Sequence, residues 1–352
     1  MFQRVVRSVD RIQQRSPRLG FIVGVVKKYS DDRGGQLAAL IAFSAFLSFF
    51  PLMLIVVTIT AFLAQRNPAL AERIRSSAMA EFPVVGAELA GNGRVLPGSG
   101  LGLAIGFVGL VWGGFGFTHS LQYAFLEVWH VPHKSRPPFA SRLARGLVVV
   151  ALMGLGVLGS VALGLLGTVV KDSRVVGALG TAGAFGVSAG LFLAVFWLLS
   201  PRNVRLMDLL PGAGVAAFGW QALQFVGIQV VGHQLRRSSQ LYGTIGAALG
   251  LIWFLVLSTQ ILLYALEVTV VRKDRLWPRS IVQPPLTASD IALLSAMAMQ
   301  EERRPEQRIS VVFDVDGAPD VDGAPDVDGA PDNAPVKLAT PEPPCTDATT
   351  AG

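Results

Sequence analysis

The chain has 352 residues, of which 51% are hydrophobic and 15% are charged, and its formal net charge is +6. An average soluble domain carries about 25% charged residues, so this composition excludes a protein whose whole surface faces water. The positive residues lie mostly between apolar runs, which indicates membrane topology rather than nucleic-acid binding. The single cysteine, Cys345, excludes an intramolecular disulfide and a cysteine-based metal cluster.

The first part of the chain, residues 1–36, is basic and is expected to form a cytoplasmic N-terminal segment. We expect no cleavable signal peptide, because the apolar run that follows is too long for a signal core. Six segments without Asp, Glu, Lys or Arg come next, and each reaches the ~20 residues needed to cross the hydrocarbon core. The sequence therefore predicts an all-α polytopic membrane protein with a six-helix transmembrane domain at 37–271. The helices are expected at about 37–64, 100–126, 146–170, 176–200, 209–232 and 241–268.

The distribution of Lys and Arg predicts the orientation of these helices. Eighteen of these residues flank the helices on the side of the two termini, and eight lie on the opposite side. Because short cytoplasmic loops carry the excess of positive charge, both termini are expected in the cytoplasm.

The segments outside the spans differ in character. Residues 68–90 have the pattern of an external amphipathic helix, which either lies on the outer membrane surface or packs against the other external loops. Residues 272–300 are expected to form a cytoplasmic juxtamembrane segment with at most one short helix, at 287–300. Residues 301–352 read as a disordered acidic and proline-rich tail with three copies of Val-Asp-Gly-Ala-Pro-Asp at 315–332. A calcium-loop interpretation fails, because these six-residue units match neither an EF-hand nor a β-helix repeat.

Polar residues and prolines in or near the spans are the candidate functional residues, because polar groups are costly inside a membrane. They could line a cavity or form a gate. The alternative is that they form interhelical hydrogen bonds, and that the boundary carboxylates pair with neighbouring Arg. The candidates are Pro51, His119, Gln122, Glu127, Asp208, Pro211, Gln221, Gln224, Tyr242, Gly243, Gln260 and Glu267.

Two prolines inside spans, Pro51 and Pro211, are expected to kink their helices, either at a transport site or only for packing. No enzymatic pattern accompanies them. His130 and His133 are close in sequence but lack carboxylates at metal-ligand spacing, so they are expected to be surface residues. The chain also has no phosphate-binding loop of the Walker type and no nucleophile elbow. We therefore expect no catalytic residues, no metal, no cofactor and no enzymatic activity.

Three segments resemble the BrkB/YihY family of bacterial inner-membrane proteins: 38–56, 202–220 and 241–269. The resemblance covers about residues 20–280. Its most specific features are Ser-Phe-Phe-Pro at 48–51, Leu-Pro-Gly at 210–212, Tyr-Gly at 242–243 and Glu267, although Ala265 and Leu266 replace the usual Gly-Ala before that Glu. The resemblance implies six transmembrane helices and a role in the envelope of a bacterial cell, in the inner membrane.

Several functions are compatible with these features. The first is a transporter or flippase-like protein that handles a lipid or an amphiphilic envelope molecule. The second is a non-catalytic scaffold that anchors cytoplasmic partners. The family's frequent label, ribonuclease BN, implies RNA hydrolysis, but the sequence offers neither a metal cluster nor a positioned acid/base pair for it. The expected partners are membrane lipids and not nucleic acid, with a homo-oligomer possible and with the tail available to bind cytoplasmic proteins.

Overall fold

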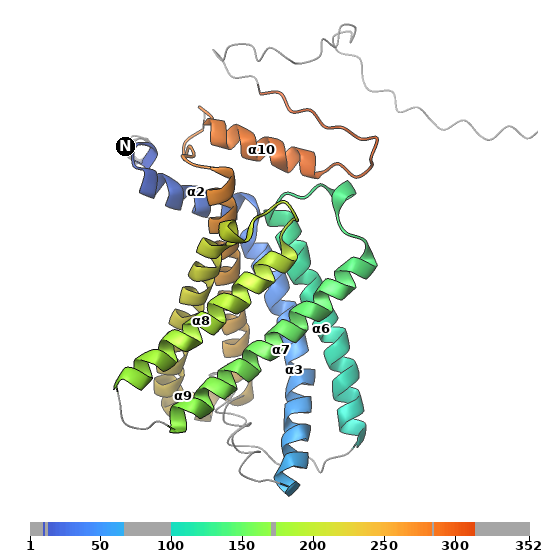
Figure 1. Cartoon of the computed structure of the whole chain (residues 1–352), viewed down its shortest axis with the longest axis vertical. Coiled ribbons are helices and arrows are strands. Elements are labelled where there is room, and N and C mark those ends of the chain that lie inside the picture. The colour runs from blue at the N-terminus through green and yellow to red at the C-terminus, as the bar shows by residue number, and fades with distance from the viewer. Residues whose placement is uncertain (1–9, 11–12, 67–99, 170–173, 284, 314–352) are drawn as a thin grey trace, which may run out of the picture. The chain divides into compact units, whose positions relative to one another are not determined.

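The computed structural model describes residues 10, 13–66, 100–169, 174–283 and 285–313, and every regular element among them is a helix. The predicted external segment at 68–90 and the repeats at 315–332 lie outside the described residues. The elements are α2 (Pro17–Asp31), α3 (Gly34–Arg66), α6 (Gly100–Val128), the 3-10 turn η1 (His133–Ser135), α7 (Phe139–Val169), α8 (Arg174–Leu199), α9 (Leu206–Asp274) and α10 (Ala288–Gln300), as Figure 1 shows.

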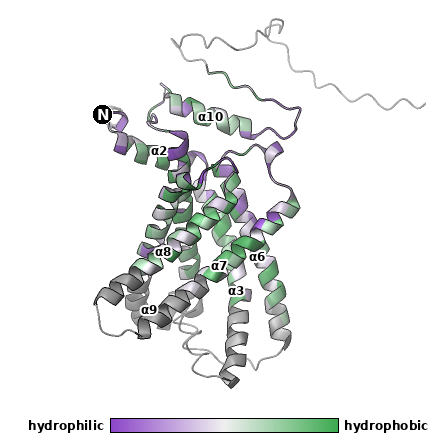
Figure 2. Ribbon diagram, viewed as in Figure 1, coloured by the Kyte–Doolittle hydropathy of each residue, from purple (hydrophilic) through white to green (hydrophobic). Residues whose placement is uncertain are grey.

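Five helical stretches are long and apolar enough to cross a membrane: Gly34–Leu52, Phe139–Gly156, Ala182–Leu199, Leu206–Gly227 and Ala248–Asp274. Most of their side chains lie outside the protein core, as expected for helices that face lipid. The apolar residues concentrate on these helices, and the hydrophilic residues concentrate at the end that carries α2 and α10 (Figure 2). The chain is thus an all-helical, multi-pass membrane protein.

One helix of this set, α6, coincides with the predicted span at 100–126 but is not among the five apolar stretches. Its first eighteen residues, 100–117, are apolar and carry no charge, but several of their side chains lie outside the described residues. Its neighbours are those of a bundle helix. A Cβ added at Gly109 would lie 2.9 Å from Pro51, and one added at Gly113 would lie 2.8 Å from the backbone of Ser48, so these glycines let α6 pack closely on α3.

The longest helix, α9, has 69 residues and includes both predicted spans at 209–232 and 241–268. A straight helix of that length would extend over roughly 100 Å, about three times the hydrocarbon core. Instead its two halves pack antiparallel: Gly219 lies beside Ile261, and the rings of Trp220 and Phe254 have centroids 6.0 Å apart. α9 therefore supplies two spans, although the residues between them, predicted to be a connection, are also assigned as helix.

The helices contact one another in a closed ring, in the order α3, α6, α7, α8, α9 and again α3. The first half of α9 contacts α8, and Gln221 donates a hydrogen bond to Ser188 Oγ across this contact. The second half of α9 contacts α3, and Thr259 Oγ1 donates a hydrogen bond of 3.1 Å to the carbonyl of Ala38 across this contact. The ring is completed by the contact between the two halves of α9.

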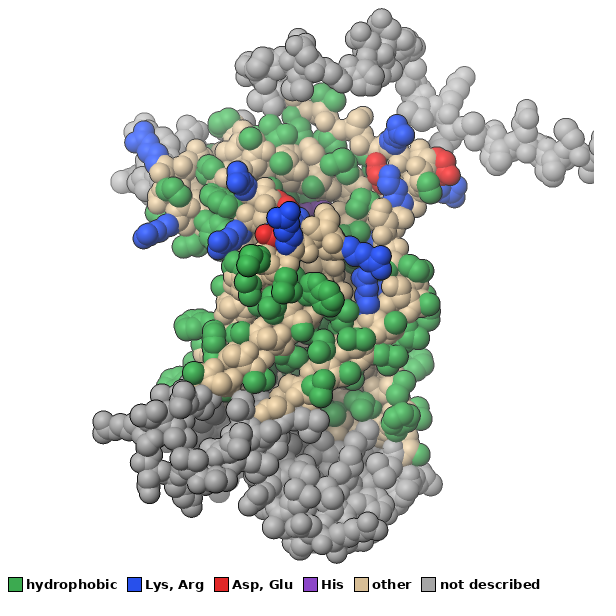
Figure 3. All heavy atoms as spheres, viewed as in Figure 1, with side chains coloured by type: hydrophobic (Ala, Val, Ile, Leu, Met, Phe, Trp, Pro, Cys, Tyr) green, Lys and Arg blue, Asp and Glu red, His purple; other side chains and the backbone are tan. Residues whose placement is uncertain are grey.

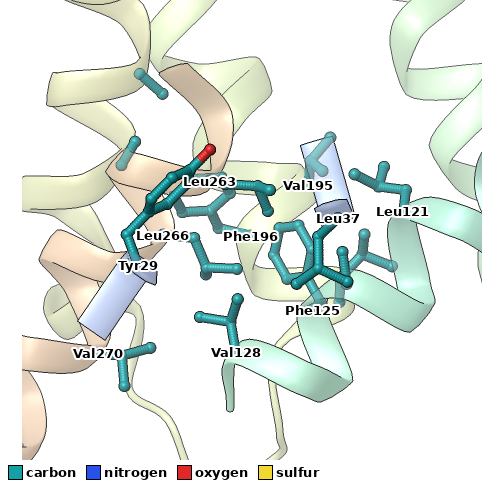
Figure 4. Packing of buried hydrophobic residues seen from close by; sticks show 14 of the residues in the cluster. Tyr29, Leu37, Leu121, Phe125, Val128, Val195, Phe196, Leu263, Leu266 and Val270 are labelled. Carbon is teal, nitrogen blue, oxygen red and sulfur yellow. The ribbon is translucent and has the colours of Figure 1, made fainter. Parts of the chain in front are cut away.

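The buried core lies at one end of this ring, where residues of α2, of the start of α3 and of the C-terminal ends of α6, α8 and α9 form one cluster. Figure 4 shows the residues of this core converging from these elements, among them Tyr29, Phe125, Phe196 and Leu266. α2 and the end of α9 thus lie at the same end of the bundle.

Candidate functional site

A group of buried ionisable side chains lies within this core end, and we name it the charge cluster: Lys28, Asp32, His130 and Glu267. The Lys28 ammonium is fully buried and lies 2.5 Å from Asp32 Oδ2 and 2.9 Å from Glu267 Oε2. It also donates a hydrogen bond to the carbonyl of Val128 at 2.9 Å. His130 Nε2 lies 3.0 Å from the other oxygen of Asp32. The cluster thus joins α2, the end of α6 and the second half of α9.

The local chain geometry places these groups. Pro17 starts α2, where a missing N–H costs nothing and the ring already holds a helical φ. Lys28 and Asp32 are four residues apart, so they share one face of the helix end. Arg33 then adopts a left-handed φ of 55°, and α3 begins at Gly34, where any larger side chain would strike the ring of Tyr29.

The charges in the cluster stabilise one another. Burial opposes the charged form of Lys28, but the negative charges of Glu267 and Asp32 outweigh it and raise the pKa of the ammonium. Burial likewise opposes the charged form of Asp32, but the hydrogen bond from His130 and the charge of Lys28 lower the pKa of this carboxyl.

Three buried polar atoms of this region have no hydrogen-bond partner in the described part of the chain: the hydroxyl of Tyr29 and both carboxylate oxygens of Glu267, although Oε2 forms the ion pair with Lys28. The ring of Tyr29 stacks on that of Tyr264 with centroids 3.9 Å apart. Burial, together with the nearby Tyr264 and Glu267, raises the pKa of Tyr29 to about 12.

A second buried polar group attaches α10 to α2. Asp290 accepts from Arg279 Nε at 2.9 Å and from Lys27 Nζ at 3.0 Å, and Arg279 Nη1 lies 2.8 Å from Asp31. Asp290 also completes a capping box with Thr287 at the start of α10. Burial alone would raise the pKa of Asp290, but hydrogen bonds from the backbone of Ser280, from Thr287 and from Lys27 hold it well below its usual range.

The other end of α10 is attached to the connection between α6 and α7. His133 Nδ1 lies 2.8 Å from the carbonyl of Gln300, and Lys134 Nζ lies 2.6 Å from Glu302. Residues 301–313, which the sequence places in the disordered tail, are therefore at least partly held by contacts to the bundle. Glu302 also accepts a hydrogen bond from the backbone of Ile309.

The twelve candidate residues do not form a single site. Glu267 alone belongs to the charge cluster. Glu127 pairs with Arg136 at 2.9 Å and also accepts from Gln300. Asp208 accepts from the backbone of Arg205 and so caps the start of α9. The carboxylates at the ends of the spans thus have protein partners. This agrees with the alternative interpretation, in which these side chains hold the helices together and do not line a cavity.

The remaining candidates are spread along the spans. Gln122 donates to the carbonyl of Arg142 at 3.0 Å, and His119 is exposed beside the same arginine. Pro51 lies against α6, Pro211 is in the first turns of α9, and Gln260 is half-buried. Tyr242 and Gly243 belong to α9, but they lie outside the residues whose burial the structure describes. One candidate differs from all of these: Gln224 has a buried Oε1 without a hydrogen-bond partner.

Three members of the charge cluster were not among the candidates: Lys28, Asp32 and His130. The spacing of Lys28 and Asp32 just before a span was a usable signal for a pair on one helix face. His130 was expected at the surface, and that expectation is wrong, because its side chain is 8% exposed and lies on Asp32. Among the residues that the structure describes, no group of three or more His, Cys, Asp and Glu side chains is placed to hold a metal ion.

Comparison with known proteins identifies the family to which the chain belongs. The chain matches the family described as "Virulence factor BrkB" over residues 25–285. It is also similar to the protein "Inner membrane protein YhjD" of Escherichia coli (strain K12), with 21% identity over 285 residues, which cover 74% of this chain and 83% of that protein. No solved structure matches. Since the matched region includes the charge cluster and all the spans described above, the chain belongs to the BrkB family of membrane proteins.

Proposed function

We propose that this chain is a transporter of a lipid or an amphiphilic envelope molecule in the bacterial inner membrane. In this proposal α3, α6, α7, α8 and the two halves of α9 form six spans, and the end with the charge cluster faces the cytoplasm. The printed name of the Escherichia coli relative supports the location. The orientation is supported by the described Lys and Arg side chains, which in Figure 3 gather around this end.

The observation that carries the proposal is the unpaired amide oxygen of Gln224 in the first half of α9. It lies in a candidate span, and no described group donates to it. A buried polar atom without a partner costs about 1–3 kcal/mol, so it needs an explanation. One turn earlier, Gln221 reaches Ser188 of α8. Neutral amides of this kind can bind the polar part of an amphiphile without requiring a buried counter-charge.

A lipid-translocation assay tests this proposal. Purified protein in proteoliposomes is given fluorescent phospholipids, and the rate at which the fluorophore crosses the bilayer is read by external chemical quenching. We expect faster crossing than in protein-free vesicles. Gln224→Leu should reduce the protein-dependent rate about tenfold, which corresponds to the loss of one hydrogen bond to the passing molecule.

The matched control is Phe225→Leu, because Phe225 is the next residue and is 67% exposed to the membrane side of the bundle. It should leave the rate unchanged. Crossing that is no faster than in empty vesicles, or a Gln224→Leu variant as fast as the wild type, would contradict the proposal.

A second candidate function is a scaffold, and the firm attachment of α10 at both ends favours it. α10 would then hold the tail beside the membrane for cytoplasmic partners. Because Asp290 and Glu302 are bound to the bundle, a truncation that tests the tail should begin after Phe313 and keep α10. A scaffold should lose its function in that truncation, and a transporter should keep it. In neither case do we propose an enzymatic activity, and purified protein should not cleave RNA with divalent cations present.

A further inference from the structure

The helix α2 has an apolar face that the rest of the described chain leaves uncovered. Leu19, Ile22 and Val26 are 47%, 57% and 51% exposed, and their spacing of three and four residues places them on one side of the helix. The opposite side is already used for packing. Gly24 lies against the backbone of Leu276 and against Trp277, where an added Cβ would be 3.1 Å from the Leu276 carbonyl oxygen.

This uncovered face lies at the boundary of the membrane-spanning region. The C-terminal end of α2 is fixed there, because Lys28 is bound to Glu267 at the end of α9. The span that begins at Gly34 has its own exposed apolar stripe, with Leu40 at 43% and Phe43 at 62%. A lipid-facing surface therefore begins within two helical turns of α2. In Figure 1 α2 lies beside the end of the bundle from which α3 departs.

The charge next to the apolar face is positive. Arg15 and Arg18 are exposed, and neither forms an ion pair with the described part of the chain. The sequence has three more arginines before them at intervals of three or four residues, which are Arg4, Arg7 and Arg11. Arginine binds phosphate oxygens through a planar fork of donors, and basic residues next to a membrane are attracted to anionic lipids.

We propose that α2 is an interfacial helix that binds anionic phospholipids of the membrane in which the chain is inserted. Leu19, Ile22 and Val26 enter the boundary between headgroups and acyl chains, and Arg15 and Arg18 bind the lipid phosphates. An amphipathic helix with this combination of faces lies in the plane of the interface. Its rigid attachment through Lys28 fixes the depth of the helix relative to the spans.

Spin labelling of the full-length chain tests the position of α2. The background is Cys345→Ser, which removes the single cysteine, and labels are placed at Ile22→Cys and, as a second site on the same face, at Val26→Cys. In lipid nanodiscs we expect both labels to be accessible to oxygen and protected from a water-soluble nickel chelate. Phe43→Cys is the lipid-facing reference, and Ser135→Cys in the exposed turn η1 is the aqueous reference.

The binding of anionic lipid is tested separately. Native mass spectrometry measures the apparent affinity of the detergent-solubilised protein for phosphatidylglycerol and for phosphatidylcholine. Arg15→Gln with Arg18→Gln should weaken phosphatidylglycerol binding roughly ten- to thirty-fold and leave phosphatidylcholine binding unchanged. The control is Arg303→Gln with Arg304→Gln, two exposed arginines near α10. Size-exclusion profiles confirm that each variant is folded.

Three results would overturn the proposal. One is nickel accessibility at Ile22 and Val26 as high as at Ser135. Another is dipolar coupling between the labels of two molecules, which would show that a second copy covers this face. The third is equal affinity for phosphatidylglycerol in the wild type and in the Arg15 and Arg18 variant.

Discussion

Replacement of Lys28 by methionine tests whether the charge cluster stabilises the bundle. Methionine keeps the length and apolar stem of lysine but removes the ammonium. Asp32 and Glu267 would then be buried with His130 as the nearest remaining cation, and only when His130 is protonated. Both carboxylates would lose their shortest contact, at 2.5 Å and 2.9 Å from the Lys28 nitrogen.

The expected magnitude follows from this geometry. Breaking a buried ion pair by removing one partner costs about 3–5 kcal/mol, because the other charge is left uncompensated in a dry environment. Lys28 is 0% exposed, so solvent does not reduce this cost. An exposed pair behaves differently: Arg303 and Glu301 are 73% and 60% exposed, and such pairs contribute at most about 1 kcal/mol. Arg303→Met is therefore the matched control.

Reversible unfolding in mixed micelles, followed by tryptophan fluorescence as the fraction of SDS rises, measures both variants. Lys28→Met should lower the free energy of unfolding by about 3–5 kcal/mol, and Arg303→Met should change it by less than about 1 kcal/mol. Adding Glu267→Leu to Lys28→Met should restore part of the loss, because it removes one of the uncompensated charges. A Lys28→Met variant as stable as the wild type would refute the assignment of the cluster as a stabilising contact.

Three other substitutions, one of them with a matched glycine control, test the remaining buried contacts. Asp290→Asn should lower the stability at neutral pH and make the stability decline less steeply in acid, which unfolding midpoints between pH 7 and pH 3 would show. The pKa of Asp290 is lowered in the folded state, so the carboxylate stabilises the fold fully above its unfolded-state pKa of about 4. It loses that contribution as the pH falls toward the folded-state pKa. Gly212→Ala should destabilise the pairing of the two halves of α9 by about 1–3 kcal/mol, because the new methyl group meets Thr269. Gly214→Ala, which meets nothing within 4 Å, should remain within about 0.5 kcal/mol of the wild type in the same unfolding assay. Tyr29→Phe should leave stability unchanged or raise it by about 1 kcal/mol, since its hydroxyl has no partner, and it should remove from an ultraviolet titration a phenol whose pKa is about 12.

Much of the fold could be predicted because long apolar segments have few alternatives in a membrane. The predicted span at 176–200 matches α8 to within two residues at each end, and the spans at 209–232 and 241–268 lie within the two antiparallel halves of α9. The family was also predicted, and the match over residues 25–285 confirms it. The helix α2 was missed as an element, because its residues are basic as well as apolar and the charge count concealed the apolar pattern.

The candidate site was predicted less well, for a physical reason. Residue-by-residue reasoning selects polar side chains inside apolar runs, and it found Glu267 and Gln224 in this way. The rest of the cluster comes from outside the spans, since Lys28, which pairs with Glu267, precedes the first span, and His130, which pairs with Asp32, follows α6. Their contacts depend on which helix ends meet in space, and hydropathy contains no information about that.

The charge cluster joins residues that are far apart in the sequence. Lys28 and Asp32 precede the first candidate span, whereas Glu267 lies near the end of the last, so the ion pair between Lys28 and Glu267 forms only when these two parts of the chain meet. Before that step Lys28 and Asp32 can remain in water as an exposed pair, which is nearly neutral in energy. Glu267 enters the membrane region at the end of its helix, where the ammonium of Lys28 can meet it as the core closes. The cluster therefore joins the first and last parts of the family's matched region, and it stabilises the bundle only when α2, the end of α6 and the second half of α9 have come together.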